Sequence, residues 1–514
     1  MERNVKTYLF LLVIFQVVFI GIFGVFKEGY HGDEIFSYGL SNSYERPFLE
    51  FSNETWDRTA LHDYLTVQTG EGFSYGSVWY NQSQDVHPPL YYALLHTICS
   101  FSPDMFSKYS GLLINLLLLP LITVVLFLLS KSLLKNDLLA FGVCVFYGLS
   151  NGAVTNALFV RMYVMATLLV LCCALWHIKA VQGSDRTVFH YIMLCALTVT
   201  GALTHYYFLI FALFSGIFYC IYGLCKRRYT EVIKYIITMA AAAALSLLIF
   251  PYMFDHIFYG YQGQTAFDNI FFLTDYMKRI MGMCIHLVRQ LLGGPVGIVI
   301  LAGMFIIMPL YAALKHKVCR IVIAPEMWYL LTATVGYMMI VAKIGIYRIA
   351  RFFFPVYPAV AVIAVWLLWQ IWGMCAARKN QLRIVLALCL LLPLGTFMCR
   401  VDTLYQENGR NRELLLQSEV KSCLYVSNEA DRGIYGKVGN LTVFDEIFYI
   451  TYDRIKNLLY ETDQMPKSVI LYCAPGELDG ERMAEEVAAC LSAKKCVFLC
   501  EEDGADIYYM MLED

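Results

Sequence analysis

Two adjacent carboxylates follow the first long apolar stretch of the chain, which ends at residue 26. His31 and Gly32 precede Asp33 and Glu34. Neighbouring carboxylates repel each other, so at least one of them needs a cation, a hydrogen bond or a raised pKa. Because such a group suits proton abstraction, we predict Asp33 as a general base and Glu34 as its companion. The alternative is a solvated acidic loop.

A histidine in front of two prolines is the second candidate group. Asp85 and His87 precede Pro88 and Pro89, and proline at the first turn fixes how a helix begins. The apolar segment 87–101 is only about fifteen residues long, so we predict an interfacial helix rather than a membrane span. His87 would then lie at headgroup depth, where an imidazole can donate a hydrogen bond to a phosphate.

Arginines and aromatic residues form a third group at the junctions between apolar runs. Arg161 and Tyr163 lie at one junction and His205 lies at another. An arginine at the outer membrane boundary is unusual and indicates a polar cavity or an anionic headgroup. Snorkelling to lipid is the alternative for Arg161, and an aromatic belt is the alternative for the tyrosines around His205.

A further cluster of cations occurs late in the chain. Lys343, Tyr347 and Arg351 follow i, i+4 spacing, and Arg348 lies between them, so a helix here would place three cations on one side. Guanidinium groups match phosphate oxygens bidentately. We predict that the donor phosphate or sugar is bound by the following residues: His87, Arg161, Tyr163, His205, Lys343, Arg348 and Arg351.

The elements that must position these residues are membrane helices. Of 514 residues, 59% are hydrophobic and 16% are charged, against roughly 45 to 50% and about 25% in a soluble domain. Apolar runs able to cross a core of roughly 30 Å recur until about residue 400. We predict eleven spans: 8–26, 109–130, 138–160, 162–178, 188–206, 208–225, 235–254, 291–314, 321–341, 352–377 and 384–399.

The lysines and arginines between these runs define an orientation. Short cytoplasmic loops collect positive charge, and the basic loops here alternate with the others when the N-terminus is placed inside. The predicted cytoplasmic residues are Lys131, Lys135, Lys179, Arg186, Lys226, Arg227, Arg228, Lys315, Lys317, Arg320, Arg378, Lys379 and Arg383. All of the candidate site residues then fall on the outer face.

The predicted organisation is a transmembrane catalytic module, residues 1–400, followed by an extracytoplasmic α/β domain, residues 401–514. Within the first part, residues 27–108 form an outer loop with interfacial helices. The C-terminal part has soluble composition and no phosphate-binding glycine loop. Its predicted strands are 422–426, 468–473, 496–500 and 507–510, with an amphipathic helix at 480–493.

Charge and cysteine patterns exclude other classes. The net charge is −2, so there is no basic excess for a nucleic acid partner. The 17 cysteines contain no C-x-x-C pair, and neither a zinc site nor a disulfide framework is indicated. Asp33, Glu34, Asp85 and His87 could ligate a divalent ion. We nevertheless expect no metal and no other cofactor, because adjacent carboxylates are poor bidentate ligands and the cations already serve the phosphate.

An acidic pair, a histidine and several cations at one membrane face predict group transfer from a lipid-borne phosphate. A polyprenyl-phosphate sugar fits, since the cations would stabilise the departing phosphate and a carboxylate would deprotonate the acceptor. Glycoside hydrolysis gives no reason for a phosphate site. A flippase for lipid-linked saccharides, or a scaffold for other envelope enzymes, remains an alternative.

The order of these motifs resembles the membrane glycosyltransferases of the GT-C fold. The motifs are Gly32-Asp33-Glu34, His87-Pro88-Pro89-Leu90-Tyr91-Tyr92, Arg161-Met162-Tyr163 and the segment 351–358. Within that fold the chain is similar to the bacterial branch related to dolichyl-phosphate-mannose protein mannosyltransferases and to the aminoarabinose transferase of lipid A. The resemblance covers about residues 1–400.

The resemblance implies roles for individual residues. Asp33 matches the catalytic base of the first outer loop, and His87 matches the histidine or lysine near the carrier phosphate. Arg161 and Arg351 match arginines that hold phosphate or sugar. The family implies a polyprenyl-phosphate-sugar donor and a lipid, glycan or protein acceptor in the envelope. The C-terminal domain departs from the mannosyltransferase pattern, which puts a protein acceptor in doubt.

Overall fold

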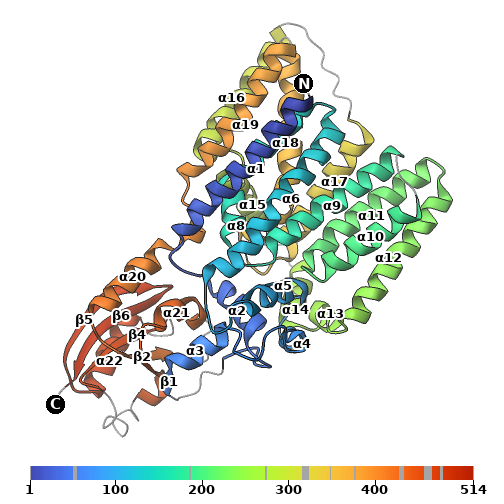
Figure 1. Cartoon of the computed structure of the whole chain (residues 1–514). Coiled ribbons are helices and arrows are strands. Elements are labelled where there is room, and N and C mark those ends of the chain that lie inside the picture. The colour runs from blue at the N-terminus through green and yellow to red at the C-terminus, as the bar shows by residue number, and fades with distance from the viewer. Residues whose placement is uncertain are drawn as a thin grey trace. The chain divides into compact units, whose positions relative to one another are not determined.

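The computed structural model describes residues 2–512 apart from 50–54, 184–186, 272–274, 315–322, 348, 376–377, 428–432, 456–465 and 475–478. The chain divides into two compact units. The first, here the membrane unit, comprises residues 1–23, 85–91 and 112–401, and the second, here the sheet unit, comprises 24–84, 92–111 and 402–514. Figure 1 shows long helices in the former and a β-sheet in the latter.

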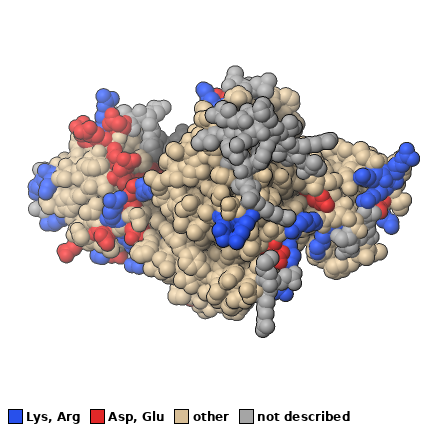
Figure 2. Space-filling model, turned by 90° about the horizontal axis from the view of Figure 1, so that it is seen from above, with Lys and Arg blue, Asp and Glu red and all other residues tan. Residues whose placement is uncertain are grey.

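The protein is a multi-pass membrane protein. Among the described residues, eight helices are long and apolar enough to span a membrane: α1 (Glu2–Val25), α6 (Lys108–Leu134), α9 (Tyr163–Gln182), α11 (Tyr207–Cys225), α12 (Tyr229–Ile249), α17 (Pro325–Ile344), α18 (Tyr357–Cys375) with the 3-10 turn before it, and α19 (Arg378–Gly395). Two bent helix pairs and the shorter apolar helix α10 (Val188–Ala202) account for the remaining predicted runs. Figure 2 shows that uncharged side chains cover most of one face.

The predicted span 138–160 is not one helix. α7 (Asp137–Gly148) and α8 (Asn151–Leu158) meet at a bend of 58°. Side chains satisfy the backbone groups at the break: Ser150 caps α8, and the N–H of Asn151 donates to the hydroxyl of Thr396 at 2.8 Å. Broken helices are tolerated at membrane depth only when such partners exist, so the polar residues of this run hold the bend.

The region between α12 and α16 contains helices that the sequence analysis did not predict. α13 (Met253–Phe258), α14 (Tyr261–Phe271) and α15 (Tyr276–Gln290) precede α16 (Gly294–Leu314), and α15 meets α16 at a bend of 103°. The helix that corresponds to the predicted span 291–314 therefore begins at Gly294, three residues after the predicted start. Gly293 and Gly294 both have positive φ at this corner, a conformation that glycine adopts without strain.

A mixed six-stranded sheet forms the core of the sheet unit, in the order β1-β3-β2-β4-β6-β5. The strands are β1 (Thr55–Asp57), β2 (Ser422–Ser427), β3 (Glu446–Thr451), β4 (Ser468–Cys473), β5 (Ala493–Glu502) and β6 (Ala505–Leu512). β2 runs parallel to β3 and β4, and the other pairs are antiparallel. The predicted α/β character is confirmed, but β1 and β3 were not predicted.

Helices pack on both faces of this sheet. Leu424, Val426, Val469 and Leu471 point to one face and pack against α22 (Gly480–Cys490), which ends three residues before its predicted end. The alternate residues point to the other face, where Tyr472 bonds to Glu502, and Glu502 in turn bonds to Asn408 of α20 (Gln406–Gln417) and Asn440 of α21 (Ile434–Leu441). Because both faces of the sheet are covered, β2 and β4 consist mostly of apolar residues rather than alternating with polar ones.

Short helices make up the rest of the sheet unit. They are α2 (Gly32–Asn42), α3 (Arg58–Leu65), α4 (Tyr75–Gln84) and most of α5 (Leu90–Ser100). α5 has 11 residues and is too short to cross a bilayer, as the sequence predicted. Its position in the membrane interface stays a prediction.

Candidate functional site

Asp85, His87 and Arg161 lie together in the membrane unit, with His87 in the middle. Nδ1 of His87 is 2.7 Å from Oδ2 of Asp85, and Nε2 is 3.2 Å from a terminal nitrogen of Arg161. Arg161 is buried, and the side chains of Asp85 and His87 are only 13% and 16% exposed. Because protein surrounds Arg161, it does not snorkel to lipid.

Charge and burial determine the protonation of the neighbouring groups. Burial by itself raises the pKa of Asp85, but His87 and Arg161 outweigh it and hold this pKa below its ordinary value. Burial lowers the pKa of His205 to about 3, and the nearby His87 and Arg161 add to this effect. At neutral pH, Asp85 is therefore ionised and His205 is neutral. We call these four residues the His87 cluster.

The end of α8 positions Arg161. Asn115 of α6 donates hydrogen bonds to the carbonyl oxygens of Ala157 and Phe159, at 2.9 and 3.0 Å. The N–H of Arg161 donates to the same Phe159 carbonyl at 2.8 Å. α9 begins two residues later, so Arg161 is held between two helix ends rather than on a mobile loop.

Aromatic side chains connect Arg161 to Arg351. The ring of Phe159 stacks on Tyr163, and the guanidinium of Arg351 lies 5.4 Å from the Phe159 ring centroid. Tyr163 in turn lies 5.4 Å from His205 between ring centroids. The structure thus brings together five of the seven predicted donor-binding residues: His87, Arg161, Tyr163, His205 and Arg351.

Lys343 belongs to a different environment. α17 ends at Ile344 and a 3-10 turn begins at Ala350, so the continuous helix that would align Lys343 with Arg351 does not form. The Lys343 ammonium lies 5.2 Å from the ring centroid of Tyr276. Arg348 lies outside the described residues.

Asp33 and Glu34 belong to the sheet unit, in the first turn of α2. His31 caps this helix: its Nδ1 accepts from the N–H of Asp33 at 3.0 Å, and the Glu34 carboxylate accepts from the N–H of His31 at 2.9 Å. This reciprocal capping box fixes where α2 begins. It also directs the two adjacent carboxylates into different surroundings.

Glu34 is buried in an ion pair that the sequence analysis did not predict. Its Oε2 lies 3.0 Å from Nζ of Lys27, both side chains are fully buried, and Lys27 also donates to the carbonyl of Thr403 at 3.0 Å. Burial lowers the pKa of Lys27, and Glu34 opposes this shift. The Asp33 side chain is 27% exposed.

Sequence reasoning gave no site role to three residues that the structure places near the candidate groups. Asp85 was considered only as a possible metal ligand, although an acidic residue two positions before a histidine also indicates a hydrogen-bond partner for that histidine. Tyr206 and His256 form a 2.9 Å hydrogen bond, and the pKa of Tyr206 is raised by burial and by Asp85. Tyr206 and His256 are 50 positions apart in the sequence, so no local pattern indicated that they pair.

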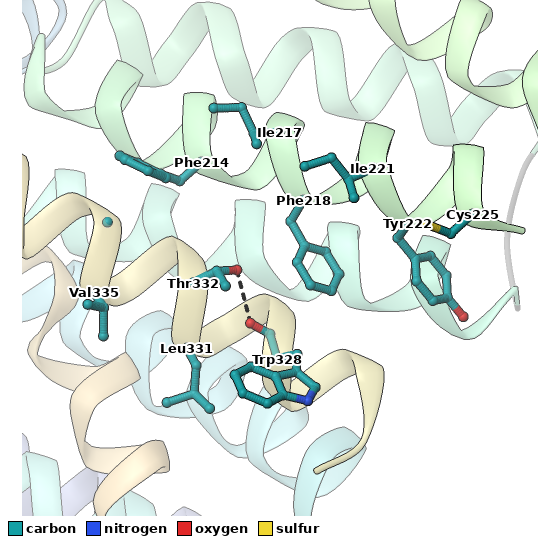
Figure 3. Close-up of a pocket in the computed structure, with 11 residues that line it drawn as sticks. Phe214, Ile217, Phe218, Ile221, Tyr222, Cys225, Trp328, Leu331, Thr332 and Val335 are labelled. Atoms are coloured by element: carbon teal, nitrogen blue, oxygen red, sulfur yellow. Dashed lines mark hydrogen bonds between the residues drawn. The ribbon is translucent and has the colours of Figure 1, made fainter.

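An apolar groove of about 700 Å³ lies apart from these residues, between α11 and α17. Figure 3 shows Phe214, Phe218 and Trp328 along it, and the hydroxyl of Thr332 is bonded to the Trp328 carbonyl. It contains none of the predicted site residues. Among the described residues, no three His, Cys, Asp or Glu side chains group as metal ligands would.

Comparison with known proteins supports the fold. No protein-family model and no curated protein sequence matches the chain. Two solved structures are similar over 98% of both chains at 11% identity: ArnT from Cupriavidus metallidurans in the apo state, with a TM-score of 0.50, and the same protein bound to undecaprenyl phosphate, with a TM-score of 0.49. The predicted GT-C fold is confirmed: this chain has the fold of ArnT.

Proposed function

We propose that the protein is an integral membrane glycosyltransferase that moves a sugar from a polyprenyl-phosphate-linked donor to an envelope acceptor. The observation that carries this proposal is the His87 cluster together with Arg351. Arg161 is buried and contacts His87, whose side chain is 16% exposed, and Arg351 lies over the ring of Phe159, which stacks on Tyr163. A convergence of two guanidinium groups and a histidine suits a phosphate group.

The proposed reaction is a single displacement at the anomeric carbon. The acceptor oxygen or nitrogen forms a bond to this carbon, and the bond from the carbon to the phosphate oxygen breaks, leaving its electron pair on the phosphate. Arg161 and Arg351 stabilise the added negative charge, with His87 beside them. Asp33 takes the proton of the acceptor, so the configuration inverts.

The proposal also assigns the other predicted site residues and the side of the membrane on which the site lies. Glu34 accompanies Asp33 as a buried partner of Lys27. A role of Lys343 and Arg348 in binding the donor rests on their positive charge alone. We place the site and residues 401–514 on the extracytoplasmic side, on the charge distribution of the short loops. The fold shared with ArnT supports this class of protein, and undecaprenyl phosphate, the ligand in one ArnT structure, is the natural probe.

A transfer assay tests the proposal. Membranes containing the full chain are supplied with undecaprenyl-phosphate-linked pentoses and hexoses, each labelled in the sugar. We expect label to move from the lipid fraction to an envelope acceptor, with release of undecaprenyl phosphate. Asp33→Asn should lower the rate by at least about 100-fold, because general base catalysis typically contributes this much.

The matched control for this variant is Asp63→Asn, a half-exposed carboxylate of the same unit, which should leave the rate unchanged. Retained transfer in a well-folded Asp33→Asn protein would contradict the assignment of the base. Equal loss in both variants would point to a general effect of charge.

One observation favours a second candidate, a flippase for lipid-linked saccharides. The α7–α8 break is a discontinuous helix of the kind that transporters use at their binding sites. The groups at the break are neutral, however, and are used to satisfy the backbone. Movement of a labelled lipid-linked sugar across sealed vesicles, without transfer, would favour this candidate.

A further inference from the structure

Asp85 has no part in the transfer chemistry described above, yet its nearly buried carboxylate touches the residue closest to the proposed phosphate. A guanidinium has no lone pair, so in the 3.2 Å contact Arg161 donates and Nε2 of His87 accepts. A neutral imidazole carries one N–H, which must then lie on Nδ1. This N–H is donated to Asp85 across 2.7 Å.

The arrangement leaves His87 in a form that cannot bind a phosphate directly. Nε2 without a proton and a phosphate oxygen are both acceptors, so they repel each other. An imidazolium, in contrast, would donate to the phosphate, and a carboxylate on Nδ1 stabilises an imidazolium. Direct binding of an anion by Nε2 would therefore require His87 to gain a proton.

The other charged and titratable groups around His87 permit this gain. Among the described residues, those facing it are Asp85, Arg161 and His205. Asp85 is ionised and favours the imidazolium, and His205 is neutral. Burial and the charge of Asp85 raise the pKa of Tyr206, so this residue is also neutral. Arg161 opposes a second positive charge, and a bound phosphate would compensate for it.

We propose that Asp85 is a positioning residue that keeps the first proton of His87 on Nδ1, so that Nε2 takes up a second proton from solvent when a polyprenyl phosphate binds. On binding, the N–H groups of Arg161 turn from Nε2 to the phosphate. The only bond formed on the protein is the N–H at Nε2. The inference rests on the proposed function, because it assumes a lipid phosphate as ligand.

Calorimetric titration of the full chain in detergent tests this coupling. The probes are undecaprenyl phosphate and its methyl ester, a diester whose single charge does not change between pH 6 and 9. The Kd of the diester should rise by up to about tenfold per pH unit as the pH increases, as uptake of one proton requires. Buffers of different ionisation enthalpy should report this proton.

Variants separate positioning from a merely structural role. Asp85→Asn should weaken binding at pH 6 about tenfold and abolish the proton uptake. His87→Lys, whose ammonium is already protonated, should bind without pH dependence. In that background Asp85→Asn should no longer weaken binding, whereas a structural role would weaken it equally in both. Asp63→Asn is again the control.

The outcomes distinguish this inference from the proposed function. Binding of the diester that does not depend on pH, or equal losses from Asp85→Asn in both backgrounds, would overturn the role of Asp85 and leave transfer intact. Failure of the native chain to bind either probe would contradict the proposed function, and the inference with it.

Discussion

At the residue scale, the two adjacent carboxylates of α2 differ in what surrounds them. Glu34 has no exposed surface and pairs with the equally buried Lys27, whereas Asp33 remains partly exposed. A buried ion pair whose partners are both satisfied is costly to break on one side, because the remaining charge is left without compensation. We therefore expect Glu34 to act mainly on stability and Asp33 mainly on transfer.

Glu34→Gln should lower the free energy of unfolding by about 3 to 5 kcal/mol, the usual cost of leaving one buried charge unpaired. Thermal unfolding of the detergent-solubilised chain measures it. The double variant Lys27→Met with Glu34→Leu should recover much of the loss, and Glu45→Gln, an exposed glutamate of the same unit, serves as control. A single variant as stable as the control would show that the pair is dispensable.

At the element scale, the bend between α7 and α8 determines where Arg161 lies. A continuous helix through residues 138–160 would place Arg161 elsewhere, because the chain would not turn between α7 and α8. In the bent arrangement, Asn115 and the N–H of Arg161 both donate to the carbonyl of Phe159. The donor-binding residues thus depend on a helix end fixed by a side chain from another helix.

Asn115→Leu should lower the free energy of unfolding by about 1 to 3 kcal/mol, because it removes the side-chain donor to the carbonyl of Ala157 and one of the two donors to the carbonyl of Phe159. Binding of undecaprenyl phosphate should weaken as well, since Arg161 loses its fixed position. Leu117→Ala, at an exposed position of the same helix, is the control and should affect neither quantity strongly. Normal binding in a destabilised Asn115→Leu protein would separate the helix end from the site.

Glu502 links several elements of the sheet unit. Its carboxyl accepts hydrogen bonds from Asn440 at 2.7 Å, Asn408 at 3.3 Å and the hydroxyl of Tyr472 at 3.2 Å. Burial raises the pKa of Glu502 to about 7, against the lowering effects of these hydrogen bonds and of Lys437. The folded state therefore holds a proton here that the unfolded chain has released.

This difference predicts that the sheet unit is more stable in acid. Between the ordinary glutamate pKa of 4.5 and about 7, the folded state binds more protons, so stability falls as pH rises through this window. Hydrogen exchange of β4 and β6 in the full chain, corrected for intrinsic rates, should show less protection at pH 8 than at pH 5. Glu502→Gln should remove this dependence, and an unchanged pH profile in this variant would contradict the assignment.

At the scale of the whole molecule, charge is divided between short basic loops and longer acidic segments that we predict to lie outside. Between residues 27 and 86 there are ten acidic residues and three basic ones, while three consecutive basic residues, 226–228, join α11 to α12. Because the bilayer separates the two sides, this division predicts orientation rather than folding.

An epitope inserted at residues 226–228 should be reached by antibody only after the cells are permeabilised. The same epitope at the C-terminus should be reached by antibody without permeabilisation of the membrane. The two tagged proteins should be expressed at the same level, so that entry of antibody into damaged cells affects both equally. The opposite pattern would place the His87 cluster on the inner side and remove the basis for an extracytoplasmic donor.

The membrane class, the approximate positions of the apolar runs and four strands of the sheet unit could be predicted from the sequence. These features depend on local composition and periodicity, which can be measured over a short stretch of neighbouring residues. The sequence also named the motifs that supply His87 and Arg161. The same composition could not distinguish Asp33 from Glu34, because both are acidic and adjacent.

Only the tertiary structure decided the bends, the caps and the partners. A hydropathy profile averages over the α7–α8 break, and β1 is a polar three-residue segment that becomes a strand only by pairing with β3. The ion pair of Lys27 with Glu34, and the contact of His87 with Arg161 across 74 positions, depend on which chain segments pack together. Such long-range contacts arise from packing of the whole chain, and for that reason no single stretch of sequence specifies them.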